Sequence, residues 1–213
     1  SDVSLIAKGD PLPEFDLYCP LMSLPYALGL TTETIPSFDS YLSADPLKVE
    51  DWRNKLGPSN LLRVGVVWSG RPEHKNDHNR SISLDALSPI LDLPVEWHSL
   101  QKEYRASDVD LLSTLDQLHQ HQEALSDFSD TAALIENMDL VVTVDTSVAH
   151  VACALGKPTW ILLPYLSDFR WLLDRSDSPW YPSATLYRQK EPGDWSPVFA
   201  KLTEDLAEKI DAY

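Results

Sequence analysis

From Leu61 onward, apolar residues gather into short continuous runs that are separated by polar segments. Such runs are typical of β-strands that are covered on both faces, as in a parallel sheet. They predict strands over Leu62–Trp68, Val95–Leu100, Leu140–Val144 and Thr159–Leu163, with weaker signals over His121–Leu125 and Ala184–Tyr187.

The segments between these runs carry helix start and stop signals. Helices are predicted from Ser83 to about Leu91, over Asp108–Leu115, from a cap at Ser129 or Asp130 to near Asn137, over Ser147–Leu155 before Gly156, and over Val198–Ala212. Strands that alternate with helices predict an α/β fold with a doubly wound parallel sheet. Ligands in such folds bind outside the carboxyl ends of the strands, so the loops there are the candidate site.

The first 57 residues follow another pattern, which predicts a boundary between segments 1–57 and 58–213. The beginning is rich in proline, and its pattern predicts a strand at Val3–Ala7 and a short helix at Pro20–Leu28. A second helix is expected to begin after Asp45 with Pro46 and to end at Gly57.

Charge and composition restrict the function. With 33 acidic and 17 basic side chains among 213 residues, the net charge is -16. The field of such a chain repels polyanions, which argues against binding to nucleic acid or to anionic membranes. No apolar run reaches the length of a transmembrane segment, and two distant cysteines predict no disulfide, so a cytoplasmic setting is expected. A phosphate ligand would need a local binding device.

The segment Val141–His150 offers one such device. A buried strand leads through Asp145 into a helix whose first amides have no partner within the helix. The hydroxyls of Thr146 and Ser147 stand beside those amides, and His150 follows one turn later on the same face. Together they predict an anion site that needs no lysine. The alternative is an ordinary helix start with a histidine packed under the sheet.

A second candidate follows the first strand. Ser69 and Gly70 would let a ligand approach the backbone, and Arg80 would reach a diphosphate as a forked donor. The glycines match neither an NTPase phosphate loop nor a dinucleotide fingerprint. His74 and His78 are four residues apart, but no helix is expected there, so no metal site is predicted. The alternative is a solvated polar loop.

Three further segments have weaker signals. The loop Ser99–Glu103 would present side chains to a base or ribose, and Asp127–Thr131 would offer backbone groups to a base edge. The aromatic tract from Asp168 to Pro182 would line a sugar pocket. A surface turn, a helix cap and a covered core are the respective alternatives.

Taken together, these segments resemble the carboxyl-terminal half of bacterial glycosyltransferases of the heptosyltransferase type, which are family 9-like. The residues that carry the resemblance are Trp68–Gly70, Lys75–Ser81, Asp127–Leu134, Val144–Ser147 with His150, and Trp171 through Trp180 to Arg188. The resemblance covers roughly Asp10 to Tyr213. It implies one Rossmann-like half of a GT-B glycosyltransferase, a module that often follows tetratricopeptide repeats and is distantly similar to O-linked N-acetylglucosamine transferases.

The resemblance also implies roles for individual residues. The donor, a nucleoside diphosphate sugar, is expected to be bound without a further cofactor or an obligatory metal. Its diphosphate would contact Thr146, Ser147 and His150, with Asp145 orienting the turn and Arg80 as the cation, for which Lys75 is a rival. Base and ribose would lie near Gln101, Lys102 and Phe128, and Ser69 and Gly70 complete the set.

In the family, the acceptor site and the candidate general base lie in an amino-terminal half. Only about 60 residues precede the first strong strand, so that half is expected to be missing. The chain, which lacks an initiator Met, is then either a domain excised from a longer polypeptide or a natural remnant of such a transferase. No catalytic residue is assigned. We expect the donor-binding half of an inverting transferase, weakly active or inactive alone. The alternatives are a non-catalytic module for protein contacts and a nucleotide-sugar epimerase.

Overall fold

The computed structural model describes residues 4–213, which form two compact units that divide between Ile35 and Pro36. The first unit contains a 3-10 turn, η1 (Leu21–Ser23), followed by the single helical turn α1 (Leu24–Ala27). Between residues 4 and 35 no side chain is buried. The strand expected at Val3–Ala7 is not formed by its last four residues, and Val3 lies outside the described part.

The second unit is built on a parallel sheet of six strands in the order β3-β2-β1-β4-β5-β6. The strands are β1 (Arg63–Val67), β2 (Glu96–Ser99), β3 (Leu118–Gln120), β4 (Leu140–Val144), β5 (Thr159–Leu163) and β6 (Ala184–Arg188). The chain starts at β1, runs outward to β3, and then returns to place β4 on the other side of β1. This order confirms the predicted doubly wound sheet and puts its switch point between β1 and β4.

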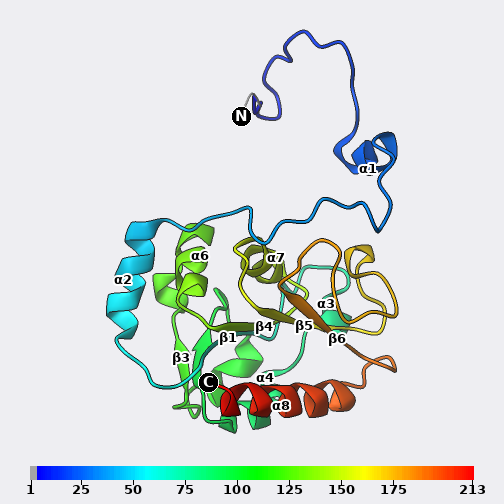
Figure 1. Ribbon diagram of the computed structural model, residues 1–213. Helices are drawn as coiled ribbons and strands as arrows, with labels where there is room; N and C mark the ends of the chain where they lie inside the picture. Colours follow the sequence, from blue (N-terminus) through cyan, green and yellow to red (C-terminus); the bar gives the residue numbers. More distant parts are fainter. Residues whose placement is uncertain (1–3) are drawn as a thin grey trace. The chain divides into compact units, whose positions relative to one another are not determined.

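Helices cover both faces of the sheet (Figure 1). Beneath it lie α4 (Leu84–Leu87) and α8 (Ser196–Asp211), and above it lie α6 (Phe128–Glu136), α7 (Ser147–Ala154) and α2 (Pro46–Leu56). Two more short helices, α3 (Asp77–Arg80) and α5 (Val109–Leu112), and four 3-10 turns, η2 (Ser88–Asp92), η3 (Ala106–Asp108), η4 (Gln122–Ala124) and η5 (Phe169–Trp171), complete the connections. Within residues 4–213, no helix combines the length and apolar character needed to cross a membrane.

The two faces explain why the strand segments are apolar throughout. On β1, Val64 and Val66 pack with residues of α4 and α8, whereas Val67 packs with residues of α2 and α6. Because both sets are buried, the strand has no solvent-facing position at which a polar residue would be favoured.

The helix α2 belongs to the second unit, because it packs against α6 through the buried Trp52 and its neighbours. Its start is as predicted, since the Asp45 carboxylate accepts a hydrogen bond from the amide of Leu47 at 2.9 Å. The structural division therefore falls after Ile35, ahead of the boundary expected at residue 57. The origin of segment 1–57 in an amino-terminal half stays a prediction.

Two further predictions, both in the second unit, were wrong in detail. The third strand is Leu118–Gln120, which pairs with β2, and the apolar Leu125 that suggested a later strand is buried after the 3-10 turn η4. The cap of α6 is Asp127, because its Oδ1 accepts from the amides of both Ser129 and Asp130. The Asp130 side chain returns a bond to the Asp127 amide, which completes a capping box.

Candidate functional site

A cavity of about 850 Å³ opens at the carboxyl edge of the sheet. Val67, Leu100 and Leu125 contribute apolar surface to it, and the loops after β1, β2, β3 and β4 supply the polar lining. Eight of the ten predicted site residues line it: Ser69, Gly70, Arg80, Gln101, Lys102, Phe128, Thr146 and Ser147. The two others, Asp145 and His150, do not line it.

The loop after β1 holds Arg80 against the end of β4. The Arg80 side chain is 14% exposed, its Nη1 donates to the Asp145 carbonyl at 2.7 Å, and its Nε lies 3.6 Å from Asp77 Oδ1. A Cβ built on Gly70 would come within 2.4 Å of Arg80 Nη2. The missing side chain at Gly70 therefore lets the guanidinium lie directly against the backbone. A short helix, α3, exists here where none was expected, and it places Arg80 at its end.

The start of α7 is open to the cavity. Thr146 stands at the N-cap with extended backbone, and no side chain of residues 4–213 caps the helix. Ser147 is the first residue of α7. Because the first amides of a helix lack partners within it, they carry partial positive charge. The bond between Arg80 and the carbonyl of Asp145 brings a full positive charge to the same turn.

His150 is turned to another part of the unit. Its Nδ1 lies 3.0 Å from the hydroxyl of Tyr181, and its ring stacks on that of Trp171 with centroids 5.2 Å apart. Burial lowers the pKa of His150, which favours the neutral imidazole. In this position the side chain packs at an aromatic cluster, whereas the spacing predicted a donor to the diphosphate.

Gln101 forms part of the cavity wall. Its Oε1 accepts from the amides of Trp68 at 3.0 Å and Ser69 at 2.8 Å, and its Nε2 donates to the carbonyl of Glu103 at 3.0 Å. These bonds tie the loops after β1 and β2 together. Phe128, in contrast, is 56% exposed at the start of α6 and keeps its ring face available.

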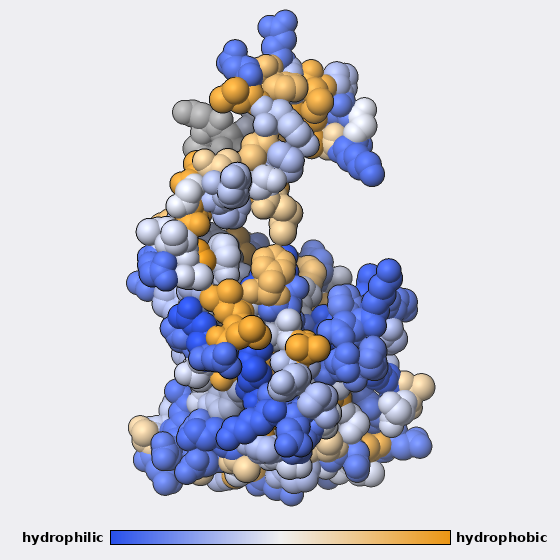
Figure 2. Space-filling view, turned by 90° about the vertical axis from the view of Figure 1, so that its right-hand side faces the viewer, coloured by the Kyte–Doolittle hydropathy of each residue, from blue (hydrophilic) through white to orange (hydrophobic). Residues whose placement is uncertain are grey.

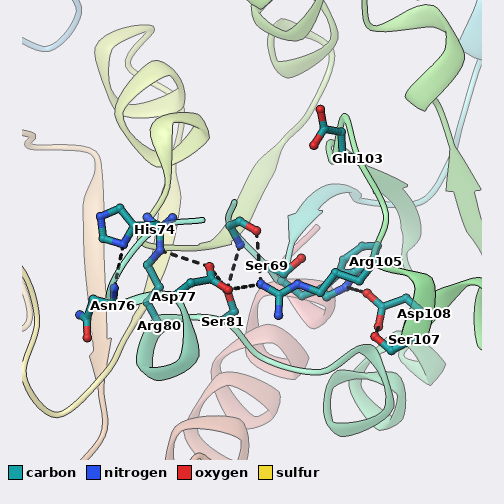
Figure 3. A network of polar contacts seen from close by, with 12 residues as sticks. Ser69, His74, Asn76, Asp77, Arg80, Ser81, Glu103, Arg105, Ser107 and Asp108 are labelled. Carbon is teal, nitrogen blue, oxygen red and sulfur yellow. Dashed lines mark hydrogen bonds and ion pairs between the residues drawn. The ribbon is translucent and has the colours of Figure 1, made fainter. Parts of the chain in front are cut away.

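Two residues of the site were missed by the sequence analysis. Arg105 lines the cavity from the loop after β2, and the buried Asp77 accepts a hydrogen bond from its guanidinium (Figure 3). The available signal was the position of Arg105 after a predicted strand end, close to Lys102.

The cavity differs in charge from the chain as a whole. Four cationic side chains line it, against three carboxylates: Arg71, Arg80, Lys102 and Arg105, with Glu73, Glu103 and Asp127. The chain carries -16 overall. The lining therefore supplies, at one place, the local positive charge that an anionic ligand requires.

Comparisons with known proteins agree with this fold. Residues 123–170 match the family model described as glycosyltransferase family 9 (heptosyltransferase). This segment contains α6, β4 and α7, so it includes the open helix start. The chain is also 25% identical over 202 residues to Protein FlbA of Caulobacter vibrioides, a match that covers 90% of this chain.

Two solved structures share the fold. The E. coli ADP-heptose lps heptosyltransferase II superimposes with a TM-score of 0.52 at 16% identity over 78% of this chain. The family 9 glycosyl transferase from Veillonella parvula gives a TM-score of 0.54 at 12% identity over 89%. The chain spans 33% of FlbA and 52% and 58% of these two structures. It therefore has the α/β fold found in GT-B heptosyltransferases and carries, over residues 123–170, a match to glycosyltransferase family 9.

Proposed function

We propose that this chain is the donor-binding half of an inverting glycosyltransferase and that its cavity binds a nucleoside diphosphate sugar. The observation that carries the proposal is the contact of Arg80 with the Asp145 carbonyl, beside the uncapped start of α7. A cation and a helix N-terminus at one turn form a favourable place for a diphosphate. The turn lies at the switch point of the sheet, where ligands of such folds bind.

In the proposed reaction, the positive charge of Arg80 and of the α7 N-terminus stabilises the transition state of glycosyl transfer. The bond between the anomeric carbon and the β-phosphate oxygen breaks, and the acceptor oxygen bonds to that carbon while a base removes its proton. Negative charge then accumulates on the leaving diphosphate. Fixed amides of α7 and the Arg80 guanidinium stabilise that charge without reorganisation, so the proposal includes no metal or further cofactor.

The nucleoside is proposed to lie at the part of the cavity wall that the loops after β2 and β3 form. The exposed ring of Phe128 offers a stacking face for the base, and Lys102 lies on the neighbouring loop. Gln101 contributes by fixing the wall, because its amide group is already engaged with backbone groups. His150 is not included among the donor contacts in this arrangement.

The acceptor site and the general base are proposed to belong to an amino-terminal Rossmann-like half outside this chain. The support is length, since the chain spans only 52% and 58% of the two solved transferases. Segment 1–57 would be the end of that half and the crossover, and tetratricopeptide repeats would precede it in the same polypeptide. We assign no catalytic residue to this chain.

Calorimetric titration of the chain with UDP, ADP and GDP tests the proposal. We expect at least one diphosphate to bind at millimolar concentration or below. Arg80→Gln should weaken that binding about 10- to 100-fold, because a charged hydrogen-bond donor contributes roughly 1.5–3 kcal/mol.

The matched control is Arg53→Gln on α2. Arg53 is exposed and pairs with Glu50, and it does not line the cavity, so the variant makes the same change in net charge at a distance. It should bind as the unmodified chain does. If no diphosphate binds, or if both variants weaken binding equally, the proposed donor site is wrong.

A second candidate function is a non-catalytic module for protein contacts. The loop after β5 exposes Tyr165, Leu166, Phe169 and Leu173, and Figure 2 shows apolar groups among hydrophilic ones on this side. Exposed apolar groups of this kind favour contact with a partner. Light scattering tests this alternative, because a chain that stays monomeric and binds a nucleoside diphosphate supports the donor-site proposal.

A further inference from the structure

We propose that Asp77 is a positioning residue of the anion site, which holds Arg80 and Arg105 on either side of the turn at Gly70. The inference rests on the proposed function, because it concerns how the same cavity binds a diphosphate. Asp77 does not line the cavity, so its effect must pass through the two arginines.

The carboxylate of Asp77 is almost fully enclosed and has three polar neighbours. Its Oδ2 accepts from Arg105 Nη2, and its Oδ1 accepts from Ser81 Oγ at 2.8 Å and lies 3.6 Å from Arg80 Nε. The side chain is 7% exposed. In Figure 3 the two guanidinium groups lie on opposite sides of this carboxylate.

The same network fixes the backbone of Gly70 at both of its polar atoms. The amide of Gly70 donates to Ser81 Oγ at 2.9 Å, and its carbonyl accepts from Arg105 Nη2 at 3.3 Å. Arg105 Nη2 also donates to Ser81 Oγ at 3.0 Å. Asp77 therefore anchors the Ser81 and Arg105 groups that set the turn against which the Arg80 guanidinium lies.

The arrangement keeps two like charges close together before any ligand is present. Two guanidinium groups repel each other, and a buried carboxylate between them offsets that repulsion. Nε of Arg80 and Nε of Arg105 are both buried without a hydrogen-bond partner in the described residues. Each arginine is therefore held in place by few contacts, and those to Asp77 are central among them. Because the two guanidinium groups are already in position, a diphosphate would bind to a preorganised pair of cations.

Asp77→Asn separates positioning from simple charge. The substitution removes one negative charge near the cavity, so electrostatics alone would tighten binding of an anion. If Asp77 acts by positioning, binding should instead weaken about tenfold or more, since an amide accepts through one atom only and carries no charge to attract the Arg80 guanidinium. The measurement is calorimetric titration of the full chain with inorganic pyrophosphate and with ADP, UDP and GDP.

The ratio of diphosphate to monophosphate affinity distinguishes positioning from a general loosening of the fold. We expect Asp77→Asn to lower that ratio, because it removes the contacts that position the guanidinium groups of Arg80 and Arg105, and a diphosphate depends on these charges more than a monophosphate does. A general loosening of the cavity would weaken the binding of both ligands equally and leave the ratio unchanged. An unchanged ratio would therefore overturn the inference. The control is Asp116→Asn, which makes the same charge change at an exposed residue away from the cavity.

Arg105→Lys provides the second variant. It keeps the positive charge but removes the guanidinium that reaches Gly70, Asp77 and Ser81. It should weaken diphosphate binding. The double variant Asp77→Asn/Arg105→Lys should lose less binding free energy than the sum of the losses in the two single variants, because the two residues act through one contact. If Asp77→Asn has no cooperative thermal transition, Arg105→Lys decides the matter, and unchanged binding in it contradicts the inference.

The outcomes separate the two proposals. An unmodified chain that binds neither pyrophosphate nor any nucleoside diphosphate overturns both. An unmodified chain that binds, together with a folded Asp77→Asn that binds equally well or more tightly, overturns only the role of Asp77.

Discussion

At the scale of single residues, the site depends on how closely a guanidinium can approach the backbone. Arg80 Nη2 would lie 2.4 Å from a Cβ at Gly70, a separation that two such atoms do not tolerate. The obstacle would be the end of a long side chain, so Arg80 would move aside while the fold remains. Glycine is therefore needed at position 70 so that the Arg80 guanidinium can lie against the backbone, and not because the backbone turn itself requires it.

Gly70→Ala tests this dependence. We expect the free energy of unfolding to change by less than about 1 kcal/mol, because the added methyl group displaces only a flexible side chain. Diphosphate affinity should fall toward that of Arg80→Gln. Thermal unfolding and calorimetry give the two values, and full affinity in a folded Gly70→Ala would show that the contact does not matter for binding.

A second residue-scale prediction concerns His98 and His121, which lie away from the cavity. His98 Nδ1 is 3.0 Å from His121 Nε2, and its Nε2 is 3.2 Å from Glu96 Oε1. Burial lowers the pKa of His98 to about 3 and that of His121 to about 4, and nearby Lys55 and His119 contribute in the same direction for His121.

These pKa values are below the usual 6.5, so between pH 6.5 and about 4 the unfolded chain binds protons that the folded chain does not. Stability is therefore complete above pH 6.5 and falls as the pH decreases, by about 2 kcal/mol per histidine between pH 7 and pH 5. His98→Gln should make this dependence shallower in urea titrations, whereas His78→Gln, at an exposed position, should not change it.

At the scale of elements, two helices begin at the same cavity with different capping. In α6 the carboxylate of Asp127 accepts from two amides, and Asp130 completes the box. In α7 the N-cap residue Thr146 makes no such bond. The start of α6 is already satisfied by its own side chains, so an anion is expected at α7, where the amides still lack a partner.

Asp127→Ala is expected to lower the free energy of unfolding by about 1 kcal/mol, the usual cost of losing an N-cap. Asp127→Asn is the matched variant, because asparagine caps nearly as well, and it should cost clearly less. Urea unfolding measures both. Equal losses in the two variants would show that the charge of Asp127, which lies 3.7 Å from Lys48, matters more than the cap.

At the scale of the whole molecule, the two units differ in how much they bury. Residues 4–35 contain no buried side chain, and Leu17, Leu5 and Tyr26 are each more than 90% exposed. The hydrophobic clusters lie wholly within Pro36–Tyr213. The second unit thus holds the core that stabilises folding, and the first holds apolar residues that it does not itself cover.

A shortened chain of residues 36–213 should therefore fold with a melting temperature within a few degrees of that of the full chain, and it should bind diphosphates equally well. Limited proteolysis of the full chain should cut first before residue 36, because exposed backbone is the preferred substrate. Loss of the cooperative transition in the shortened chain would show that the first unit contributes to the core.

The sequence by itself determined the architecture and most of the site's location. Continuous apolar runs specify strands with both faces covered, and in a doubly wound sheet the carboxyl ends converge, so Ser69, Lys102, Phe128 and Ser147 were expected around one cavity. They lie there because parallel strands place all of their carboxyl ends at one edge of the sheet.

Only the tertiary structure decided which polar groups remain free. His150 and Gln101 were expected to meet a ligand, but the first is paired with Tyr181 and the second with backbone amides. Arg105 and Asp77 meet across 28 positions of sequence. Such pairings depend on distances between loops that no local pattern encodes, because hydrogen bonds and buried charges are satisfied by whichever partner the packed chain brings within reach.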